Sequence, residues 1–211
     1  MSIAGLFDNK NKTSSKVNGV VIGVVTNNND EEGLGRVKVK FPCISNDDES
    51  HWARITTPMA GKEMGICFLP EVDDEVLVVF ENGDINTPYI IGSLWNGTDK
   101  PPVTNDGENN IRVIKSRSGH TITLNDKKGE ETIEIVDKTA NNSIVISTKD
   151  KKISIKSDQD IELIAPNGKI SLNAKDIEMK SSAGTKLDAS AGLDLMASGT
   201  TTVKGATVNI N

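Results

Sequence analysis

The chain has 211 residues, of which 26% are charged and 3% are aromatic, and its formal net charge is −6. This acidic balance argues against nucleic-acid binding, which requires a basic face, and no apolar run is long enough to span a membrane as a helix. We expect no signal peptide, and the two cysteines, Cys43 and Cys67, are expected to be reduced core thiols rather than a disulfide framework.

The two halves of the chain differ in composition. All seven aromatic residues lie in the first 95 positions, and residues 1–104 contain 9 basic and 15 acidic side chains, against 15 of each in residues 105–211. The proline pair and polar run of residues 99–110 are typical of a linker. We therefore predict an N-terminal tail at 1–16, a first domain at 17–104 and a second domain at 105–211.

Six short apolar runs bounded by turn residues predict the strands of the first domain. They span residues 17–27, 34–42, 52–58, 65–70, 71–84 and 87–97. A polar loop separates the second run from the third, and an Asn82-Gly83 turn closes the fifth. Short strands with tight turns and no amphipathic helix favour a small closed antiparallel barrel. The side chains expected in its core are Val37, Val39, Trp52, Phe68, Val78 and Trp95.

The second domain repeats one short pattern, in which two apolar residues alternate with polar ones as in a strand with one buried face. The repeats are TITL (121–124), TIEI (132–135), SIVI (143–146), KISI (152–155), DIEL (160–163), KISL (169–172), DIEM (176–179), GLDL (192–195) and TVNI (207–210). A strand that buries two side chains recovers too little free energy to offset its ordering entropy. The repeats must therefore stack on each other or on another chain, as in a β-solenoid. A monomeric solenoid with about three repeats per coil remains the alternative.

Several motifs in order resemble one family. They are GLGRVKVKFP (33–42) and WARITTPMAGKEMGICFLPEVDDEVLVVFENGDINTPYIIGSLWNG (52–97). They are similar to the OB-fold module of the contractile-tail spike family, which comprises phage baseplate assembly protein V and the valine-glycine-repeat (VgrG) spikes. Residues 116–138 are similar to the segment in which these spikes pass from barrel to β-helix. The sequence shows neither the long hub region of VgrG spikes nor a lysozyme domain, which places it with the short spikes of phage tails or tail-derived bacteriocins.

The resemblance implies an all-β fold in which an OB-fold barrel precedes an intertwined trimeric β-helix, shaped as a triangular prism. The needle side chains that would point inward are Ile153, Ile155, Ile161, Leu163, Ile170 and Leu172. Ser154, Glu162 and Ser171 would face water.

The resemblance also implies partners. They are two further copies of the chain, hub and tube proteins at the barrel end, and a small PAAR-type tip protein at the needle end. The residues expected to dock the tip are Thr207, Val208, Asn209, Ile210 and Asn211. Such a spike is assembled in the bacterial cytoplasm, belongs to the baseplate particle and contacts the target envelope transiently.

We expect no enzymatic activity, cofactor or metal site. Asp73, Asp74 and Glu75 are adjacent carboxylates, but their place before a strand indicates a solvated turn. His51 and His120 have no partner at ligand spacing. The function indicated is a structural central spike, with a type VI secretion spike as the alternative. An oligonucleotide-binding barrel and a β-solenoid polysaccharide-degrading enzyme are distant alternatives, because the barrel is acidic and the needle charges are scattered.

Overall fold

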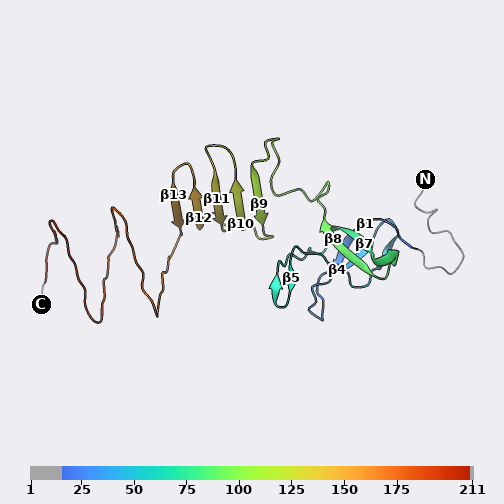
Figure 1. Ribbon diagram of the computed structural model, residues 1–211, viewed down its shortest axis with the longest axis horizontal. Helices are drawn as coiled ribbons and strands as arrows, with labels where there is room; N and C mark the ends of the chain where they lie inside the picture. The colour runs from blue at the N-terminus through green and yellow to red at the C-terminus, as the bar shows by residue number, and fades with distance from the viewer. Residues whose placement is uncertain (1–15, 210–211) are drawn as a thin grey trace. The chain divides into compact units, whose positions relative to one another are not determined.

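The computed structural model describes residues 16–209, which are all-β apart from a short 3-10 turn (Figure 1). Contacts divide the chain into one unit that ends at Gln159 and another that begins at Asp160. The first unit holds all the strands found among the described residues. The predicted tail, save Lys16, lies outside those residues, and the boundary predicted near residue 104 stays a prediction. No helix within residues 16–209 is long and apolar enough to cross a membrane.

A six-stranded sheet forms the first part of this unit. Its strands are β1 (Val21–Asn27), β2 (Lys38–Phe41), β3 (Ser45–Glu49), β4 (Arg54–Ile55), β7 (Glu75–Phe80) and β8 (Pro88–Ser93). They lie in the order β3-β2-β1-β7-β8-β4, and only β4 and β8 pair in parallel. An isolated bridge joins the segments before β2 and β4, with Ala53 donating to the Val37 carbonyl at 2.7 Å and Val37 donating to that of Ala53 at 3.0 Å. This bridge closes the sheet into a barrel.

The barrel core follows from alternation along the strands. In β7 every second side chain is buried, and the aromatic rings of Phe41 and Phe80 meet edge to face at 5.3 Å. An edge-to-face pair adds stabilisation beyond the area it buries. The buried side chains are Val25, Val37, Val39, Phe41, Ala53, Val76, Val78, Phe80 and Ile90.

The predicted core needs correction at its aromatic members. Trp52 is only half-buried, with its ring 5.7 Å from the Arg36 guanidinium carbon and 5.3 Å from the Lys38 ammonium. Phe68 and Trp95 are 70% and 68% exposed in the single chain, so placing them in the barrel core was wrong. Both lie beyond a strand end, because residues 66–70 leave the sheet and β8 stops at Ser93.

Two predicted elements also differ. Residues 65–70 do not form a strand; instead β5 (Ala60–Gly61) and β6 (Met64–Gly65) make a small hairpin. The polar loop expected after β2 contains β3, an edge strand whose backbone pairing needs no apolar face. The Asn82-Gly83 turn is present within the 3-10 turn Glu81–Gly83, where Asn82 has a φ of 52°.

A five-stranded antiparallel sheet forms the second part of the unit. Its strands are β9 (Ile111–Lys115), β10 (Thr121–Asn125), β11 (Thr132–Val136), β12 (Ser143–Ser147) and β13 (Lys152–Lys156), paired in sequence order. The first four predicted repeats are confirmed as β10 to β13. β9 was not predicted as a repeat. All four pairings run without a register shift, so the same faces of all five strands coincide.

The loop before β2 is organised by one carboxylate. Asp30 accepts hydrogen bonds from the Leu34 backbone N–H at 3.1 Å and from the Arg36 guanidinium at 2.8 and 2.9 Å, and its side chain is only 4% exposed. The hydrogen-bonded Arg36 guanidinium holds the pKa of the Asp30 carboxyl well below its usual range. The ionised form of Asp30 therefore stabilises the folded barrel.

We expect Asp30→Asn to lower the melting temperature of the barrel at pH 7. The depressed pKa means that the unfolded chain takes up the proton first on acidification. The stabilisation is therefore complete above the unfolded-state pKa of about 3.9 and is lost below it. The difference between wild type and variant should shrink as the pH falls below about 4. Tryptophan fluorescence measures it, because Trp52 and Trp95 both lie in this part of the chain.

Glu31→Gln is the matched control, because Glu31 is an exposed neighbouring carboxylate. It should leave the melting temperature almost unchanged at both pH values. A difference between Asp30→Asn and wild type that stayed constant from pH 7 to pH 3 would contradict the role given to the ionised Asp30.

Candidate assembly surface

One face of the β9–β13 sheet is almost entirely aliphatic. The register places Ile122 opposite Ile135 and Ile114, and Leu124 opposite Ile133. The same alignment continues through β12 and β13, so two rows of large apolar side chains cross the sheet. The two rows comprise Ile114, Ile122, Ile135, Ile144 and Ile155, and then Leu124, Ile133, Ile146 and Ile153. Arg112 stands at the β9 end of the second row.

This aliphatic face is uncovered in the single chain. Its nine isoleucine and leucine side chains are 40% to 68% exposed. The opposite face carries mainly threonine, serine, lysine and glutamate, with Ile111, Val113, Val136 and Val145 among them. A sheet normally packs its apolar face against a second layer. The sidedness of this sheet therefore marks the aliphatic face as the surface that another layer covers.

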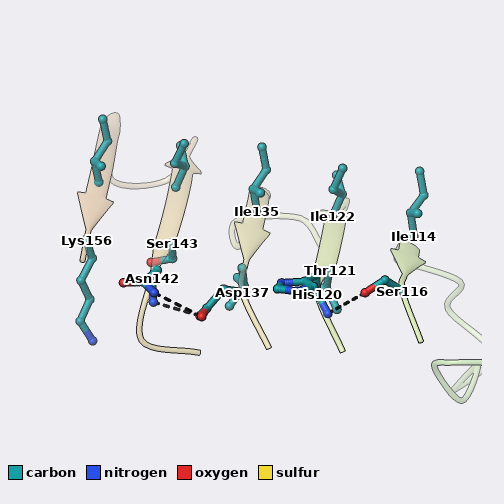
Figure 2. A pocket seen from close by; sticks show the side chains of 13 residues that line it. Ile114, Ser116, His120, Thr121, Ile122, Ile135, Asp137, Asn142, Ser143 and Lys156 are labelled. Atoms are coloured by element: carbon teal, nitrogen blue, oxygen red, sulfur yellow. Dashed lines mark hydrogen bonds between the residues drawn. The ribbon is translucent and has the colours of Figure 1, made fainter. Parts of the chain in front are cut away.

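A hollow of about 500 Å³ runs along the first isoleucine row. Figure 2 shows Ile114, Ile122 and Ile135 standing in line on neighbouring strands, with polar residues gathered at one end of the hollow. At that end the His120 backbone N–H donates to the Ser116 hydroxyl at 3.0 Å. The hollow is lined mainly by aliphatic carbon, so covering it would remove apolar surface from water.

The polar end of the hollow is a set of tightly bonded turns. The Asp137 carboxylate accepts from the Thr139 hydroxyl at 2.7 Å, the Asn142 backbone N–H at 3.1 Å and the Asn142 amide at 3.2 Å. The Thr139 hydroxyl first, and then Asn142, lower the pKa of Asp137 to about 2. His120 Nδ1 accepts from the Lys138 backbone N–H at 3.2 Å. These bonds fix the turns that set the strand register.

The second unit presents the same pattern without a sheet. Over residues 160–209 no strand is formed, and every residue except Ala165 is exposed. The repeats at 160–163, 169–172, 176–179 and 192–195 therefore have no partner strand in the single chain. Ordering such a segment costs conformational entropy, and in the single chain no burial of its leucine and isoleucine side chains offsets that cost.

The remaining predicted site residues divide as follows. None of the six predicted needle-core side chains is buried in the single chain, so their inward orientation stays a prediction. Thr207, Val208 and Asn209 are exposed, whereas Ile210 and Asn211 lie outside the described residues. Docking of a tip protein at residues 207–211 likewise stays a prediction.

Of the side chains considered for catalysis or metal binding, Asp74 has a structural role. The Asp74 carboxylate accepts from the Glu71 backbone N–H at 2.8 Å, as in a turn. Cys43 and Cys67 are exposed, so the expectation that they are core thiols was wrong. In residues 16–209 no group of three or more metal-ligating side chains is assembled.

Comparison with known proteins identifies the first part of the chain. Residues 21–95 match the type VI secretion system/phage-baseplate injector OB domain. The actin cross-linking toxin VgrG1 of Vibrio cholerae is 30% identical over 131 residues. Residues 21–95 therefore belong to that injector OB-domain family, and the chain is VgrG-like. Its six-stranded barrel is the OB domain of that family.

Two further relatives show how much of a VgrG protein this chain matches. The type VI secretion system spike protein VgrG3 of V. cholerae is 30% identical over 131 residues, and VgrG1a of Pseudomonas aeruginosa is 34% identical over 113 residues. The alignments cover 56%, 56% and 48% of this chain for VgrG1, VgrG3 and VgrG1a, but only 12%, 13% and 18% of the relatives. This VgrG-like chain therefore corresponds to a small part of these relatives' length.

We expect Ile155→Asp to abolish self-association of this VgrG-like chain, while Ser154→Asp leaves it nearly unchanged. The two positions are neighbours on β13, but only Ile155 belongs to the aliphatic face. A carboxylate buried there without a partner would be strongly unfavourable. Light scattering on the two purified variants measures the difference. Equal association of both variants would contradict the assignment of faces.

Proposed function

We propose that this VgrG-like chain is the central spike of a contractile injection machine, a homotrimer that is pushed through a target cell envelope. The observation that carries the proposal is the uncovered aliphatic face of β9–β13 together with the unpaired, strand-patterned residues 160–209. Further chains of the same alternation would supply both the missing layer and the missing ladder partners. Family membership favours further copies of this chain as the source.

Three copies of the five-stranded sheet can close a core that one copy leaves open. With the aliphatic faces turned inward, the sheets form the three sides of a triangular prism. A five-residue strand is about 17 Å long, which gives the width of each side. The two apolar side chains of each strand from β10 to β13, and Ile114 of β9, then meet their equivalents from the other two copies, with Arg112 at the β9 end of the prism. The threonine, serine and lysine side chains remain on the outside, where they meet water.

In this proposal residues 160–209 continue the prism by pairing between copies. Each extended segment donates and accepts its backbone hydrogen bonds with the other two chains, which removes the unpaired edges of the single chain. Neighbouring strands are about 4.8 Å apart, so every further layer lengthens the needle by that amount. The shaft is stiff because no layer yields without disturbing three chains. Its role is mechanical and not enzymatic.

The partners in this proposal follow the family resemblance. Hub and tube proteins contact the barrel end, and a small PAAR-type tip protein binds at residues 207–211. The spike assembles in the bacterial cytoplasm and is carried in the baseplate particle. We favour a phage tail or tail-derived bacteriocin as its context. A type VI secretion spike is the second candidate, supported by the names of VgrG3 and VgrG1a.

The mass of the purified chain in solution tests the proposal. We expect light scattering to give three times the 22.6 kDa chain mass at all workable concentrations. Dissociation should be slow even in denaturant, because opening one layer exposes the apolar faces of three chains. A stable monomer of 22.6 kDa would overturn the proposal.

Charge placed inside the needle should prevent assembly of residues 160–209. We expect Ile161→Asp and Leu172→Asp each to reduce trimer recovery severely, because the threefold axis would gather three unpaired carboxylates. Glu162→Ala, adjacent to the first site but on the predicted outer face, is the control and should assemble normally. Trimer recovery by size-exclusion chromatography with light scattering is the measurement. Normal assembly of both aspartate variants would show that these side chains do not point inward.

A further inference from the structure

The β5–β6 hairpin forms an apolar arm on the barrel. We define the arm as residues 56–70; in Figure 1 its hairpin stands away from the strands of the six-stranded sheet. Its exposed large side chains are Met59, Met64, Ile66, Phe68 and Leu69. Phe68 is 70% and Met64 is 64% exposed. An isolated soluble domain rarely presents so many large apolar side chains on one projection.

The arm is a built structure rather than a loose loop. The Thr57 hydroxyl donates to the Ile66 carbonyl at 2.6 Å, and the Ile66 backbone N–H donates to the Met59 carbonyl at 3.0 Å. At its base the Asn28 amide donates to the Pro70 carbonyl at 3.0 Å. Gly65 has a φ of 153°, and a Cβ there would lie 2.5 Å from the Met59 carbonyl oxygen. The arm therefore holds its apolar side chains in solvent in a defined conformation.

A second apolar surface lies on the outside of the same barrel. The inward side chains of β1 and β7 alternate with outward ones, and the register sets Ile22 opposite Leu77. Ile91 follows the buried Ile90 in β8 and lies at a register shift, between Ile90, which pairs with Val78, and Gly92, which pairs with Leu77. We call Val20, Ile22, Leu77, Val79 and Ile91 the outer patch. Ile22 and Ile91 are 48% and 41% exposed, although barrel exteriors in water normally carry polar side chains.

We infer that the arm of one copy packs on the outer patch of the next copy, so that three OB domains form a closed ring of head-to-tail contacts. The inference rests on the proposed homotrimer. Two different apolar surfaces on one domain are what a heterologous interface requires, because each copy must offer both the inserting part and the receiving part. A foreign partner would need only one of them. On the same chain the arm side chains and Val20, Ile22 and Ile91 of the patch are exposed, whereas Leu77 and Val79 are half-buried. The arm therefore does not cover the exposed part of its own patch.

The charges at the two surfaces are also complementary. The arm tip carries Lys62 and Glu63 between its two short strands. Next to the outer patch a hollow of about 300 Å³ is lined by Glu75, Asp99 and Lys100, with Asp74 and Trp95 on its wall. Glu75 occupies the outward position two residues before Leu77, so the hollow adjoins the patch. Lys62 can therefore face carboxylates while Glu63 faces Lys100.

Apolar contacts are expected to contribute more to the affinity of this interface than charged pairs. Met59 and Met64 are unbranched side chains that adapt to an irregular surface, and Phe68 offers a flat aromatic anchor. The receiving side offers branched aliphatic side chains, and Gly92 stands opposite Leu77 with no atom within 4 Å of where its Cβ would be. That open position leaves room for an inserted side chain. The charged pairs at the rim fix the orientation and contribute less to affinity.

A native cysteine makes the contact testable in the full-length chain. Cys43→Ser leaves Cys67, which is exposed on the arm between Ile66 and Phe68, as the remaining thiol. Adding Ile91→Cys puts a second thiol on the outer patch. We expect a short bis-maleimide to join Cys67 of one copy to the introduced thiol of the next. Denaturing gels should then show covalent dimers that proceed to covalent trimers, since a closed ring links every copy to two others.

Matched variants separate the arm contact from trimer formation. Cys43→Ser with Lys38→Cys places the second thiol on the polar outer face of β2 and should give no interchain product. Adding Phe68→Ser to the Ile91→Cys protein should slow crosslinking about tenfold, which corresponds to about 1.4 kcal/mol for a truncated aromatic anchor. The molar mass of every sample is also measured by light scattering before crosslinking.

Each outcome then has one meaning. A trimer by mass that gives no link between position 67 and position 91 overturns the ring of arms and leaves the spike proposal standing. Dimers in the Cys43→Ser protein without Ile91→Cys mean that arms meet arms, which also overturns the head-to-tail contact. A monomer by mass overturns the spike proposal itself.

Discussion

The structure depends on one constraint: a five-residue strand with alternating side chains can bury only two of them, and the single chain supplies no second layer. Nine aliphatic side chains on the β9–β13 sheet keep about half of their surface in water. Covering that remaining surface is worth roughly 1 kcal/mol per side chain, or about 9 kcal/mol for each copy. This is as large as the whole stability of a typical domain. In the proposed trimer, association would therefore supply most of the stability of this part of the chain.

The barrel solves the same problem within one chain. Its sheet closes through the bridge between Val37 and Ala53, so the inward side chains of β1, β2, β7 and β8 face each other across a common interior. The β9–β13 sheet has no such closure and stays open, with a strand edge at each end. One chain thus carries a barrel with a closed core, followed by a sheet whose aliphatic face is uncovered in the single chain. That order would suit the proposed spike, because each barrel could fold before the three needles found their register.

Sequence patterns predicted the parts of the fold that are decided locally. The repeats that became β10 to β13 are joined by short turns, such as the one bonded to Asp137, so alternation and turn chemistry were sufficient. β9 was missed because Arg112 occupies the place that an aliphatic residue fills in the next strand, Leu124. Phe68, Trp95 and Cys67 were assigned to the core because they are apolar, yet they are exposed. A sequence shows that a side chain is apolar and does not show which chain buries it. This ambiguity is greatest in proteins whose interfaces and cores have the same composition. It explains why the apolar alternation of the candidate surface could be predicted from the sequence, whereas its exposed position in the single chain could not.

In the proposed trimer the remaining physical question is which register the three chains adopt. Residues 160–209 would leave the register open, and the β9–β13 sheets would fix it. The repeats within residues 160–209 have similar composition and the same alternation, so a slip that preserves the inward and outward faces would cost little locally. Pairing between three such chains would by itself permit several registers of similar free energy. In the proposed trimer the β9–β13 sheets would remove that freedom, because each is aligned within its own chain by turns and by ladders without a register shift. Three such sheets that met through their aliphatic faces would start residues 160–209 at the same height. From that point every layer could be added in only one register, so a repetitive segment would specify a single structure.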